Sequence, residues 1–248
     1  MPRFIPFRLA AACALAIMLF LAIAATAGAR GPVASLRVLN TAGKVLAEDS
    51  FGARTVTVRT SRKATCFGPA NAGSGRPATI KGPTALGMLV QAAKRTRSLR
   101  PLLITDAFDF GLGLCGIGGF VSEDEGSWYL KVNHRTPSVG GDSVRIRRGD
   151  EVLWYLATSF PYPDELSLVA PRRVVAGTPF TVRVFSYDEK GKRRPEAGAR
   201  VTGGTGPTGA DGRTTVTLSR PARLTARSGK DIPSNREAVC VARKCPRG

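Results

Sequence analysis

Alternating apolar and polar positions predict a β-meander near the middle of the chain. A first strand ends at Asn133, and two further strands are expected at residues 143–147 and 151–155. Successive side chains of a strand point to opposite faces, so Trp154 and Tyr155 are expected on different sides of the sheet. The pattern therefore predicts a small sheet that carries aromatic residues on both faces.

The residues before the meander combine short strands with one helix. Alternation predicts strands at residues 33–41 and 54–60. Residues 83–97 carry apolar side chains at helical spacing, with Thr84 as the N-cap and basic residues in the last turn. The glycine-dense residues 111–119 are expected to form a loop. This order of elements predicts an α+β domain.

The residues after the meander show no helical periodicity. A proline-rich linker is predicted at residues 159–164, between the α+β domain at residues 30–158 and a second domain at residues 165–248. Turns separate short alternating runs at a spacing of about ten residues, which is typical of a small antiparallel β-sandwich. The runs expected to form strands are residues 166–170, 179–187, 199–202, 213–218, 222–227 and 237–242. The predicted fold class of the whole chain is α+β and rich in strands.

Residues 1–29 predict a secretory signal peptide rather than a part of the fold. Arg3 and Arg8 are followed by an apolar run at residues 9–25 and then by small residues that suit signal peptidase. An uncleaved signal anchor is the alternative, because the apolar run approaches the length of a membrane span. Both interpretations export the rest of the chain, which is then secreted or associated with the cell envelope.

The cysteines that follow the predicted cleavage site are Cys66, Cys115, Cys240 and Cys245. An even number of cysteines in an exported chain favours disulfides. We expect the pairs Cys66–Cys115 and Cys240–Cys245, because each pair lies within one predicted domain, and the second pair would clip the C-terminal tail. No CxxC spacing occurs and His134 is the only histidine, so no metal site is expected.

The formal net charge of the chain is +19. One interpretation is attraction to anionic cell-envelope polymers or lipid head groups. The other is that the charge is simply solvated and reflects a GC-rich genome, since the basic residues are scattered apart from short clusters such as residues 97–100. No aromatic residues are interleaved with them, so no specific nucleic-acid partner is expected. Membrane contact is expected only through the N-terminal segment, if that segment is not cleaved.

The meander also resembles a known family. The matching residues are Trp128, Tyr129, Val132, Asn133, Gly149, Asp150, Val152, Trp154 and Tyr155. In this spacing they resemble the small β-rich domain at the C-terminal end of transcobalamin and intrinsic factor, which bacterial exported proteins also carry. The resemblance covers about residues 33–157 and implies a β-grasp-like fold with a binding role. The chain departs from the family at His134, where the family most often has glycine, the residue that adopts positive φ most easily.

In the vitamin carriers, this domain supplies one wall of the cobalamin site and an α-helical barrel supplies the other. The barrel has no counterpart in this sequence, so the resemblance does not imply cobalamin and no cofactor is expected. Residues 165–243 resemble, more loosely, the immunoglobulin-like or carboxypeptidase-regulatory-like modules of bacterial surface proteins, through residues 175–182 and 211–216. Such modules normally act as spacers or adhesion elements.

Several short motifs are weak indicators of chemistry. Residues 111–116 fit GxGxxG, but no helix is predicted after them, as dinucleotide binding requires. Residues 148–150 read Arg-Gly-Asp, which the resemblance explains as the turn before the tryptophan strand. The acidic residues at 122–127 lack the spacing of a calcium loop. His134 has no accompanying nucleophile motif, so no catalytic residue is assigned.

The aromatic residues of the meander are the candidate ligand site. Trp128, Tyr129, Trp154 and Tyr155 lie on adjacent predicted strands, with Asn133 at the end of the first. These side chains form either an open platform for a ligand or core packing under the helix.

These observations favour a non-enzymatic, exported protein that binds an unidentified small molecule or protein. One alternative is a basic envelope-adhesion protein that is held on anionic wall polymers or lipid by charge. Another alternative is a hydrolase with an unrecognised site, for which His134 is the best candidate general base.

Overall fold

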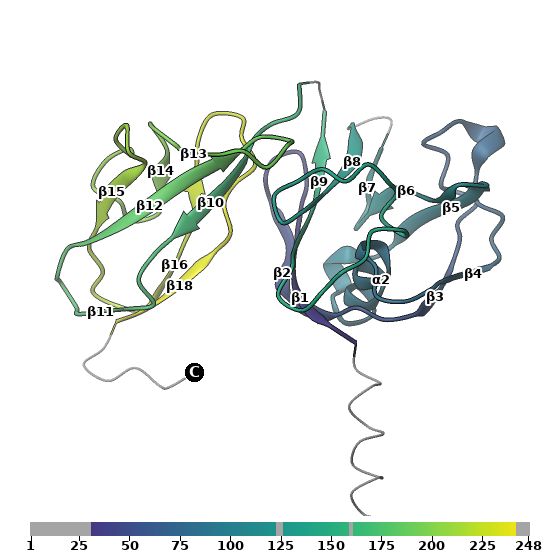
Figure 1. The fold of residues 1–248 in the computed structure, drawn as a ribbon, viewed down its shortest axis with the longest axis horizontal. Coiled ribbons are helices and arrows are strands. Elements are labelled where there is room, and N and C mark those ends of the chain that lie inside the picture. Colours follow the sequence, from purple (N-terminus) through teal and green to yellow (C-terminus); the bar gives the residue numbers. More distant parts are fainter. Residues whose placement is uncertain (1–30, 123–125, 159–160, 242–248) are drawn as a thin grey trace, which may run out of the picture.

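The computed structural model describes residues 31–122, 126–158 and 161–241. The chain forms an N-terminal lobe up to residue 158 and a C-terminal lobe from residue 161, which lie side by side (Figure 1). The described residues are rich in strands and contain one α-helix, so the coarse fold class is confirmed. The predicted signal peptide lies outside the described residues, and none of the described helices is long and apolar enough to cross a membrane.

A mixed four-stranded sheet organises the N-terminal lobe. Its strand order is β2 (Val45–Gly52), β1 (Val33–Leu39), β9 (Glu151–Ala157) and β8 (Ser127–Val132). The central strands β1 and β9 are parallel, whereas β2 and β8 pair antiparallel with their neighbours. The sequence pattern predicted β1, β8 and β9. It missed β2, because a run of acidic and polar residues interrupts the apolar alternation of that strand.

Helix α2 (Ala85–Arg95) packs on one face of this sheet, close to the predicted bounds. Thr84 is its N-cap, as predicted, and the Oγ1 atom of Thr84 accepts a hydrogen bond from the backbone N–H of Gly87 at 3.1 Å. The apolar face of the helix meets Leu36 and Trp154 of the sheet in one buried core. Each large apolar side chain buried there stabilises the fold by roughly 1.5–3 kcal/mol.

Two smaller sheets complete the N-terminal lobe. Strand β3 (Val56–Arg59) pairs with β4 (Pro77–Ile80), and β5 (Leu102–Phe108), β6 (Gly111–Ile117) and β7 (Phe120–Val121) form a second sheet. The glycine-dense stretch that was expected to be a loop is therefore mostly strand β6. Its few apolar side chains face the core beside α2, and this packing together with pairing to β5 outweighs the low strand propensity of glycine.

The predicted Cys66–Cys115 disulfide is present and ties the loop after β3 to strand β6. Cys240, at the end of the C-terminal lobe, is also disulfide-bonded. Its predicted partner, Cys245, lies outside the described residues.

Residues 143–147 do not form the predicted middle strand of the meander. The backbone N–H of Ala85 donates to the carbonyl oxygen of Val144 at 3.0 Å, and the N–H of Ile146 donates to that of Pro83 at 2.9 Å. Ile146 is buried in the core beside α2. The alternation of this segment therefore reflects packing against the start of the helix, and β8 pairs directly with β9 instead.

The C-terminal lobe consists of short strands separated by turns, as the sequence predicted. One sheet contains β10 (Glu165–Val169), β12 (Phe180–Tyr187), β13 (Arg193–Pro195) and β15 (Arg213–Val216). A second sheet contains β11 (Arg173–Val174), β18 (Glu237–Val241) and β16 (Ala222–Leu224). Strands β14 (Arg200–Val201) and β17 (Ala226–Arg227) pair with each other. Apolar side chains from these groups share one buried core, which is the packing expected of a sandwich.

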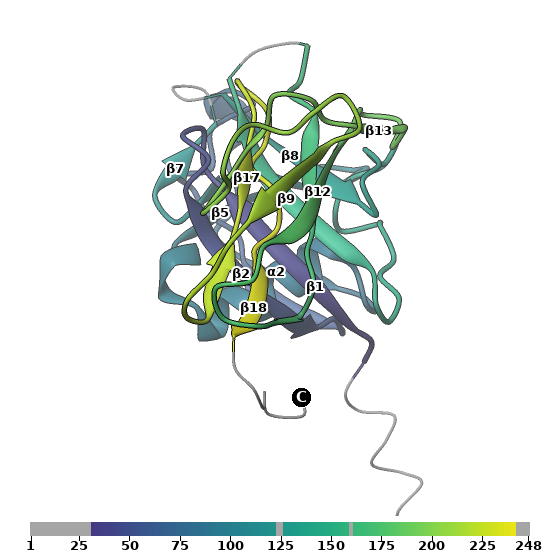
Figure 2. The same cartoon turned by 90° about the vertical axis from the view of Figure 1, so that its left-hand side faces the viewer.

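The C-terminal lobe covers the face of the central sheet that points away from α2. Figure 1 shows the sheet between the helix and this lobe, and Figure 2 shows the lobe in front of β1 and β9. Leu39, Leu153 and Tyr155 of the sheet pack with Ile232 of the C-terminal lobe in a separate apolar cluster. Both faces of the central sheet are therefore buried.

Candidate functional site

Alternation along β8 and β9 sends the four aromatic residues of the meander to opposite faces. Trp128 and Trp154 belong to the core beside α2. Tyr129 and Tyr155 belong to the cluster on the other face, between the lobes. The sheet thus uses all four side chains in packing, and Trp128, Tyr129 and Trp154 also border a groove at the surface.

An apolar groove of about 510 Å³ lies beside the two tryptophans, and we call it the aromatic groove. Its aromatic lining consists of Phe67, Phe108, Phe110, Trp128, Tyr129 and Trp154. The chain has two tryptophans, and both line this groove. Small-molecule sites in proteins have volumes of roughly 300–1,000 Å³ and mostly apolar walls, so the aromatic groove has the size and character of such a site.

Three phenylalanine rings stand together at the aromatic groove. Phe108 and Phe110 are stacked, with centroids 5.0 Å apart and ring planes 18° apart. Phe67 meets Phe108 edge-on at 5.1 Å. Phe110 is 84% exposed and Phe67 is 50% exposed, although apolar rings are more stable out of water. Because exposed apolar rings seldom gather in one place on a protein surface, this cluster makes the aromatic groove a candidate site.

The sequence analysis did not identify these phenylalanines. Phe108 and Phe110 flank the β5–β6 turn, just before the glycine-dense residues that were expected to form a loop. Phe67 is far from them in sequence, and the disulfide of its neighbour Cys66 brings it to β6. The adjacent cysteine was the one sequence signal that pointed to this position.

The polypeptide around the aromatic groove is held by specific contacts. Oδ2 of Asp142 accepts a hydrogen bond from the backbone N–H of Leu112 at 3.0 Å. This bond links the loop between β8 and β9 to strand β6. Gly141 lies against the indole of Trp154, and a Cβ atom there would be 2.7 Å from the Cη2 atom of the ring. The Nε1 atom of Trp154 is buried and has no hydrogen-bond partner among the described residues. These contacts hold the groove lining in place, and the unpaired Trp154 donor is buried rather than exposed to the groove.

Asn133 does not line the aromatic groove but fixes the turn after β8. Asn133 and His134 have φ values of 49° and 67°, so His134 adopts the left-handed conformation that glycine adopts more easily. The Nδ2 atom of Asn133 donates to Oδ1 of Asp150 at 3.0 Å, and its Oδ1 accepts from the N–H of Glu151 at 2.9 Å. Asn133 therefore joins the turn after β8 to the turn before β9.

The other sequence motifs have structural roles or lie outside the described residues. The second carboxylate oxygen of Asp150 accepts from the N–H of Arg147 at 2.7 Å, so the Arg-Gly-Asp aspartate is used within its own turn. Residues 111–116 lie in strand β6, with no helix after them. Residues 123–125 of the acidic loop are outside the described part. Within the described ranges, no group of three or more His, Cys, Asp or Glu side chains is placed to hold a metal ion.

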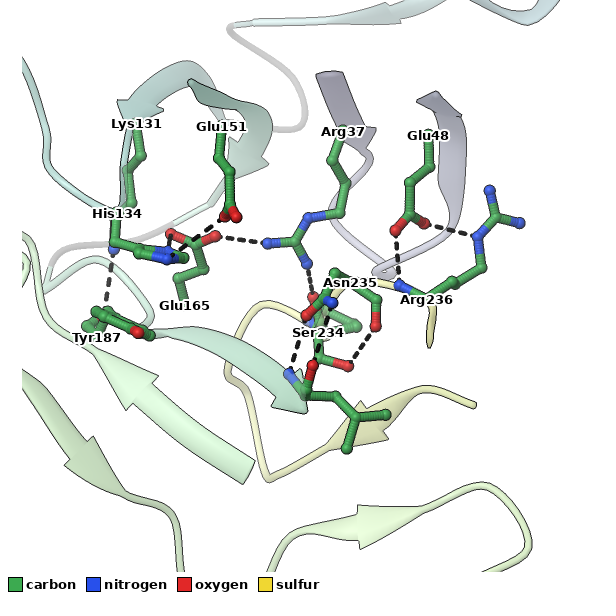
Figure 3. Close-up of polar contacts among 12 residues, drawn as sticks. Arg37, Glu48, Lys131, His134, Glu151, Glu165, Tyr187, Ser234, Asn235 and Arg236 are labelled. Atoms are coloured by element: carbon green, nitrogen blue, oxygen red, sulfur yellow. Dashed lines mark hydrogen bonds and ion pairs between the residues drawn. The ribbon is translucent and has the colours of Figure 1, made fainter. Parts of the chain in front are cut away.

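A buried polar cluster joins the lobes on the face of the sheet opposite α2 (Figure 3). We call it the interlobe cluster, and its centre is Glu165, whose side chain is 4% exposed. Oε1 of Glu165 lies 2.6 Å from Nη2 of Arg37, and Oε2 lies 3.1 Å from Nδ1 of His134. Burial raises the pKa of Glu165, but the contacts with His134 and Arg37 outweigh burial and hold the pKa below its usual value.

His134 and Lys131 complete the interlobe cluster. The imidazole of His134 stacks on the ring of Tyr187 with centroids 3.7 Å apart, and its Nε2 atom lies 3.4 Å from Oε2 of Glu151. Both ring nitrogens thus face carboxylates rather than a nucleophile. The Nζ atom of Lys131 donates to the carbonyl oxygens of Tyr187 and Asp188 at 3.3 Å each, and burial lowers the pKa of this lysine. These contacts cross from β8 to the end of β12.

The tyrosines of the meander belong to the same interface. Tyr129 lies 5.8 Å from Tyr155 and 3.8 Å from Tyr162, measured between ring centroids, and its hydroxyl is hydrogen-bonded to that of Tyr162. Burial raises the pKa of Tyr129 to about 12, so this phenol stays neutral at physiological pH. Tyr129 and Tyr155 therefore help to dock the C-terminal lobe on the sheet.

No family model matches this chain, and no curated protein or solved structure is significantly similar to it. The functional assignment therefore rests on the aromatic groove, on the interlobe cluster and on the features of the sequence.

Proposed function

We propose that this chain is an exported, non-enzymatic binding protein whose aromatic groove takes a small apolar molecule with a planar ring. The observation that carries the proposal is the exposed phenylalanine group, in which Phe110 is 84% exposed and stacked on Phe108. A ligand that covers such rings gains about 25 cal/mol for each Å² of apolar surface removed from water. The groove volume of about 510 Å³ accommodates a molecule of that kind.

The arrangement of the rings favours a planar ligand. The Phe108–Phe110 stack presents a ring face, and Phe67 stands at 84° to Phe108 and so meets it edge-on. Aromatic rings prefer offset-stacked and edge-to-face contacts, and each such pair contributes about 0.5–1.5 kcal/mol beyond the burial of area. Polar groups are few in the wall, so ring shape rather than charge selects the ligand.

We further infer that the N-terminal lobe is a β-grasp-like domain of the transcobalamin C-terminal type. Support comes from the mixed sheet with parallel central strands and from helix α2 packed on it. Further support comes from the hydrogen bonds of Asn133, which join the turn after β8 to the turn before β9, where the sequence matches the family. The C-terminal lobe is then an immunoglobulin-like sandwich that docks against the face of this sheet that points away from α2. No cofactor is part of the proposal, and cobalamin is not the ligand that we expect.

Export is part of the same proposal. It is supported by the basic residues and the apolar run in the first 25 residues and by the Cys66–Cys115 disulfide. Disulfides persist in oxidising compartments, which include the outside of the cell.

The hydrolase alternative has less support than binding. His134, its best candidate, lies between Glu165 and Glu151 and is stacked on Tyr187. A general base needs a nitrogen within reach of the group that it deprotonates, and here both nitrogens face carboxylates. His134 fits an interface residue better than a catalytic one.

The test is a titration of the full chain with N-phenyl-1-naphthylamine, a neutral aromatic probe. Tryptophan emission is the readout, because both tryptophans line the groove and the apolar run at residues 9–25 contains none. We expect saturable quenching in the wild type. The Phe110→Ala variant is expected to bind about tenfold more weakly, because it loses one stacking contact and the burial of one ring.

The control is Val175→Ala, which shortens an exposed apolar side chain in the C-terminal lobe. Its probe affinity should equal that of the wild type. Equal affinities in the Phe110 variant and the wild type would show that the probe does not use the groove, and the proposal would fail.

A further inference from the structure

A second groove, of about 830 Å³, lies on the N-terminal lobe where α2, β3 and the short η3 turn (Arg97–Leu99) meet. We call it the basic groove. Its charged lining consists of Arg59, Lys94, Arg97 and Arg100. Val58, Val90 and Leu102 are among the apolar residues that line it, and they are buried or half-buried. The groove therefore combines exposed cations with a recessed apolar floor.

These cations have no anionic partners within the described parts of the chain. None of the four forms an ion pair there, whereas arginines elsewhere pair with carboxylates, as Arg236 does with Glu48 at 2.6 Å. The charges of this groove are therefore not neutralised by ion pairs among the described residues. A surface that gathers cations of this kind attracts anionic ligands.

The helix dipole does not account for this arrangement. Basic residues in the last turn of a helix are favoured by the dipole, which explains Lys94 and Arg95. Arg59 comes from strand β3 and Arg100 from the segment after η3. Three separate elements converge on the groove, so it is the tertiary fold that gathers the charge.

The backbone that carries the arginines is held in place. The hydroxyl of Ser98 donates to the carbonyl oxygen of Leu46 in β2 at 2.5 Å, and Leu99 is fully buried. On the other wall, Nη1 of Arg59 donates to the carbonyl oxygen of Gly75 at 2.8 Å. A preorganised site loses less conformational entropy when it binds.

The residues that line the basic groove favour a polymer over a membrane surface. Binding to a bilayer uses apolar side chains that project into it. The large apolar side chains that project from the described surface include Phe67, Phe110 and Val139, none of which lines this groove. A surface that presents cations without projecting apolar side chains fits an anionic polymer better than a lipid bilayer.

We propose that the basic groove binds a linear phosphate-bearing polymer of the cell envelope. The proposal goes beyond ligand binding in the aromatic groove and gives a specific site to the charge-based adhesion that the sequence suggested. Arginine guanidinium groups form paired hydrogen bonds with phosphate oxygens, which suits the three arginines of this groove.

The test uses long-chain inorganic polyphosphate with the full chain at low ionic strength, followed by calorimetry. We expect the Arg97→Gln/Arg100→Gln variant to bind about tenfold more weakly, because it removes two of the four cations that line the groove. Arg220→Gln/Arg223→Gln is the matched control, because it removes the same charge from exposed positions of the C-terminal lobe. The control should stay within about twofold of the wild type.

Other outcomes would overturn the proposal. Equal losses in both double variants would show attraction to net charge alone, and no loss in the groove variant would place the polymer elsewhere. Orthophosphate that binds as tightly as polyphosphate would exclude a polymer site. A third outcome would indicate that the surface recognises membranes instead. In that case the wild type would bind phosphatidylglycerol vesicles but not polyphosphate, and the groove variant would bind the vesicles more weakly. The naphthylamine titration reports the aromatic groove separately, so either proposal can fail alone.

Discussion

Asp231 and Glu165 are carboxylates at the boundary between the lobes, and their surroundings shift their pKa values in opposite directions. Burial raises the pKa of Asp231 to about 6, and nearby carboxylates add to the rise. Burial acts on Glu165 in the same way, but there His134 and Arg37 outweigh it and the pKa falls. Asp231 therefore contributes stability at low pH that is lost as the pH rises through about 6. Glu165 contributes stability above its unfolded-state pKa, which is lost as the pH falls through its folded pKa.

The Asp231→Asn variant is expected to be more stable than the wild type at pH 7 and nearly unchanged at pH 4. The charged form of Asp231 is disfavoured in the folded state, and the amide removes that penalty. We expect a gain of about 1 kcal/mol in the free energy of unfolding at neutral pH, because Asp231 is only partly buried and solvent screens its interactions. Urea unfolding at the two pH values measures the difference.

Asp211→Asn is the control for this measurement. Asp211 is exposed and 3.6 Å from Arg213, so its replacement should change the free energy of unfolding by no more than about 0.5 kcal/mol at either pH. A gain at Asp231 of the same size at pH 4 and pH 7 would contradict the assigned role of its ionisation.

At the scale of single elements, strands with clear alternation were predictable and their partners were not. The faces of β9 follow from its sequence, because side chains of a strand alternate whatever the strand pairs with. The same alternation in residues 143–147 was misassigned, since Val144 and Ile146 are buried against the start of α2 and not in the sheet. An alternating pattern predicts that one face of a segment is buried, but it does not predict which element packs against that face.

The candidate site was less predictable than the fold. The meander aromatics were the expected ligand residues, yet the structure buries most of their surface between α2 and the C-terminal lobe. The exposed rings that form the groove with them come from Phe67, Phe108 and Phe110, which meet through a disulfide and a strand pairing. Long-range contacts of this kind leave no local pattern in the sequence.

The loop that carries Phe67 gives a prediction at this scale. Replacing both cysteines, as Cys66→Ala/Cys115→Ala, opens a link between residues 49 positions apart and should lower the free energy of unfolding by about 4 kcal/mol. The same variant should bind the naphthylamine probe more weakly where it remains folded, because Phe67 is no longer held against Phe108. Urea unfolding and the probe titration measure the two effects.

Reduction provides the control for the double-cysteine variant. A reductant should lower the tryptophan-reported stability of the wild type by more than that of the variant, which retains the disulfide of Cys240. Unchanged probe affinity in a folded variant would mean that Phe67 does not contribute to the groove.

At the scale of the whole molecule, the central sheet packs against both lobes. Its α2 face carries the core of the N-terminal lobe, and its other face carries the apolar cluster around Tyr155 and Ile232. The interlobe cluster lies on that second face as well (Figure 3). The Arg236–Glu48 ion pair adds a further link between the C-terminal lobe and strand β2. The short predicted linker gave no indication that charged groups would be buried where the lobes meet.

Because a buried ion pair joins the lobes, we expect them to unfold together. Glu165→Gln removes the carboxylate from the C-terminal lobe and leaves Arg37 of the N-terminal lobe buried without its charged partner. Loss of one member of a buried pair costs about 3 kcal/mol. The unfolding midpoint should fall equally in tryptophan fluorescence, which reports only the N-terminal lobe, and in far-ultraviolet circular dichroism, which reports both lobes.

Glu151→Gln is the matched control, because Glu151 also faces His134 but its side chain is 62% exposed. Its replacement should cost less than about 1 kcal/mol, since solvent screens the pair. If the lobes were independent, Glu165→Gln would shift the dichroism and leave the tryptophan midpoint unchanged. A common shift would instead mean that the aromatic groove, on the far side of the sheet, depends for its stability on a residue of the other lobe. The C-terminal lobe would then support the binding domain by covering the sheet, in addition to acting as a spacer.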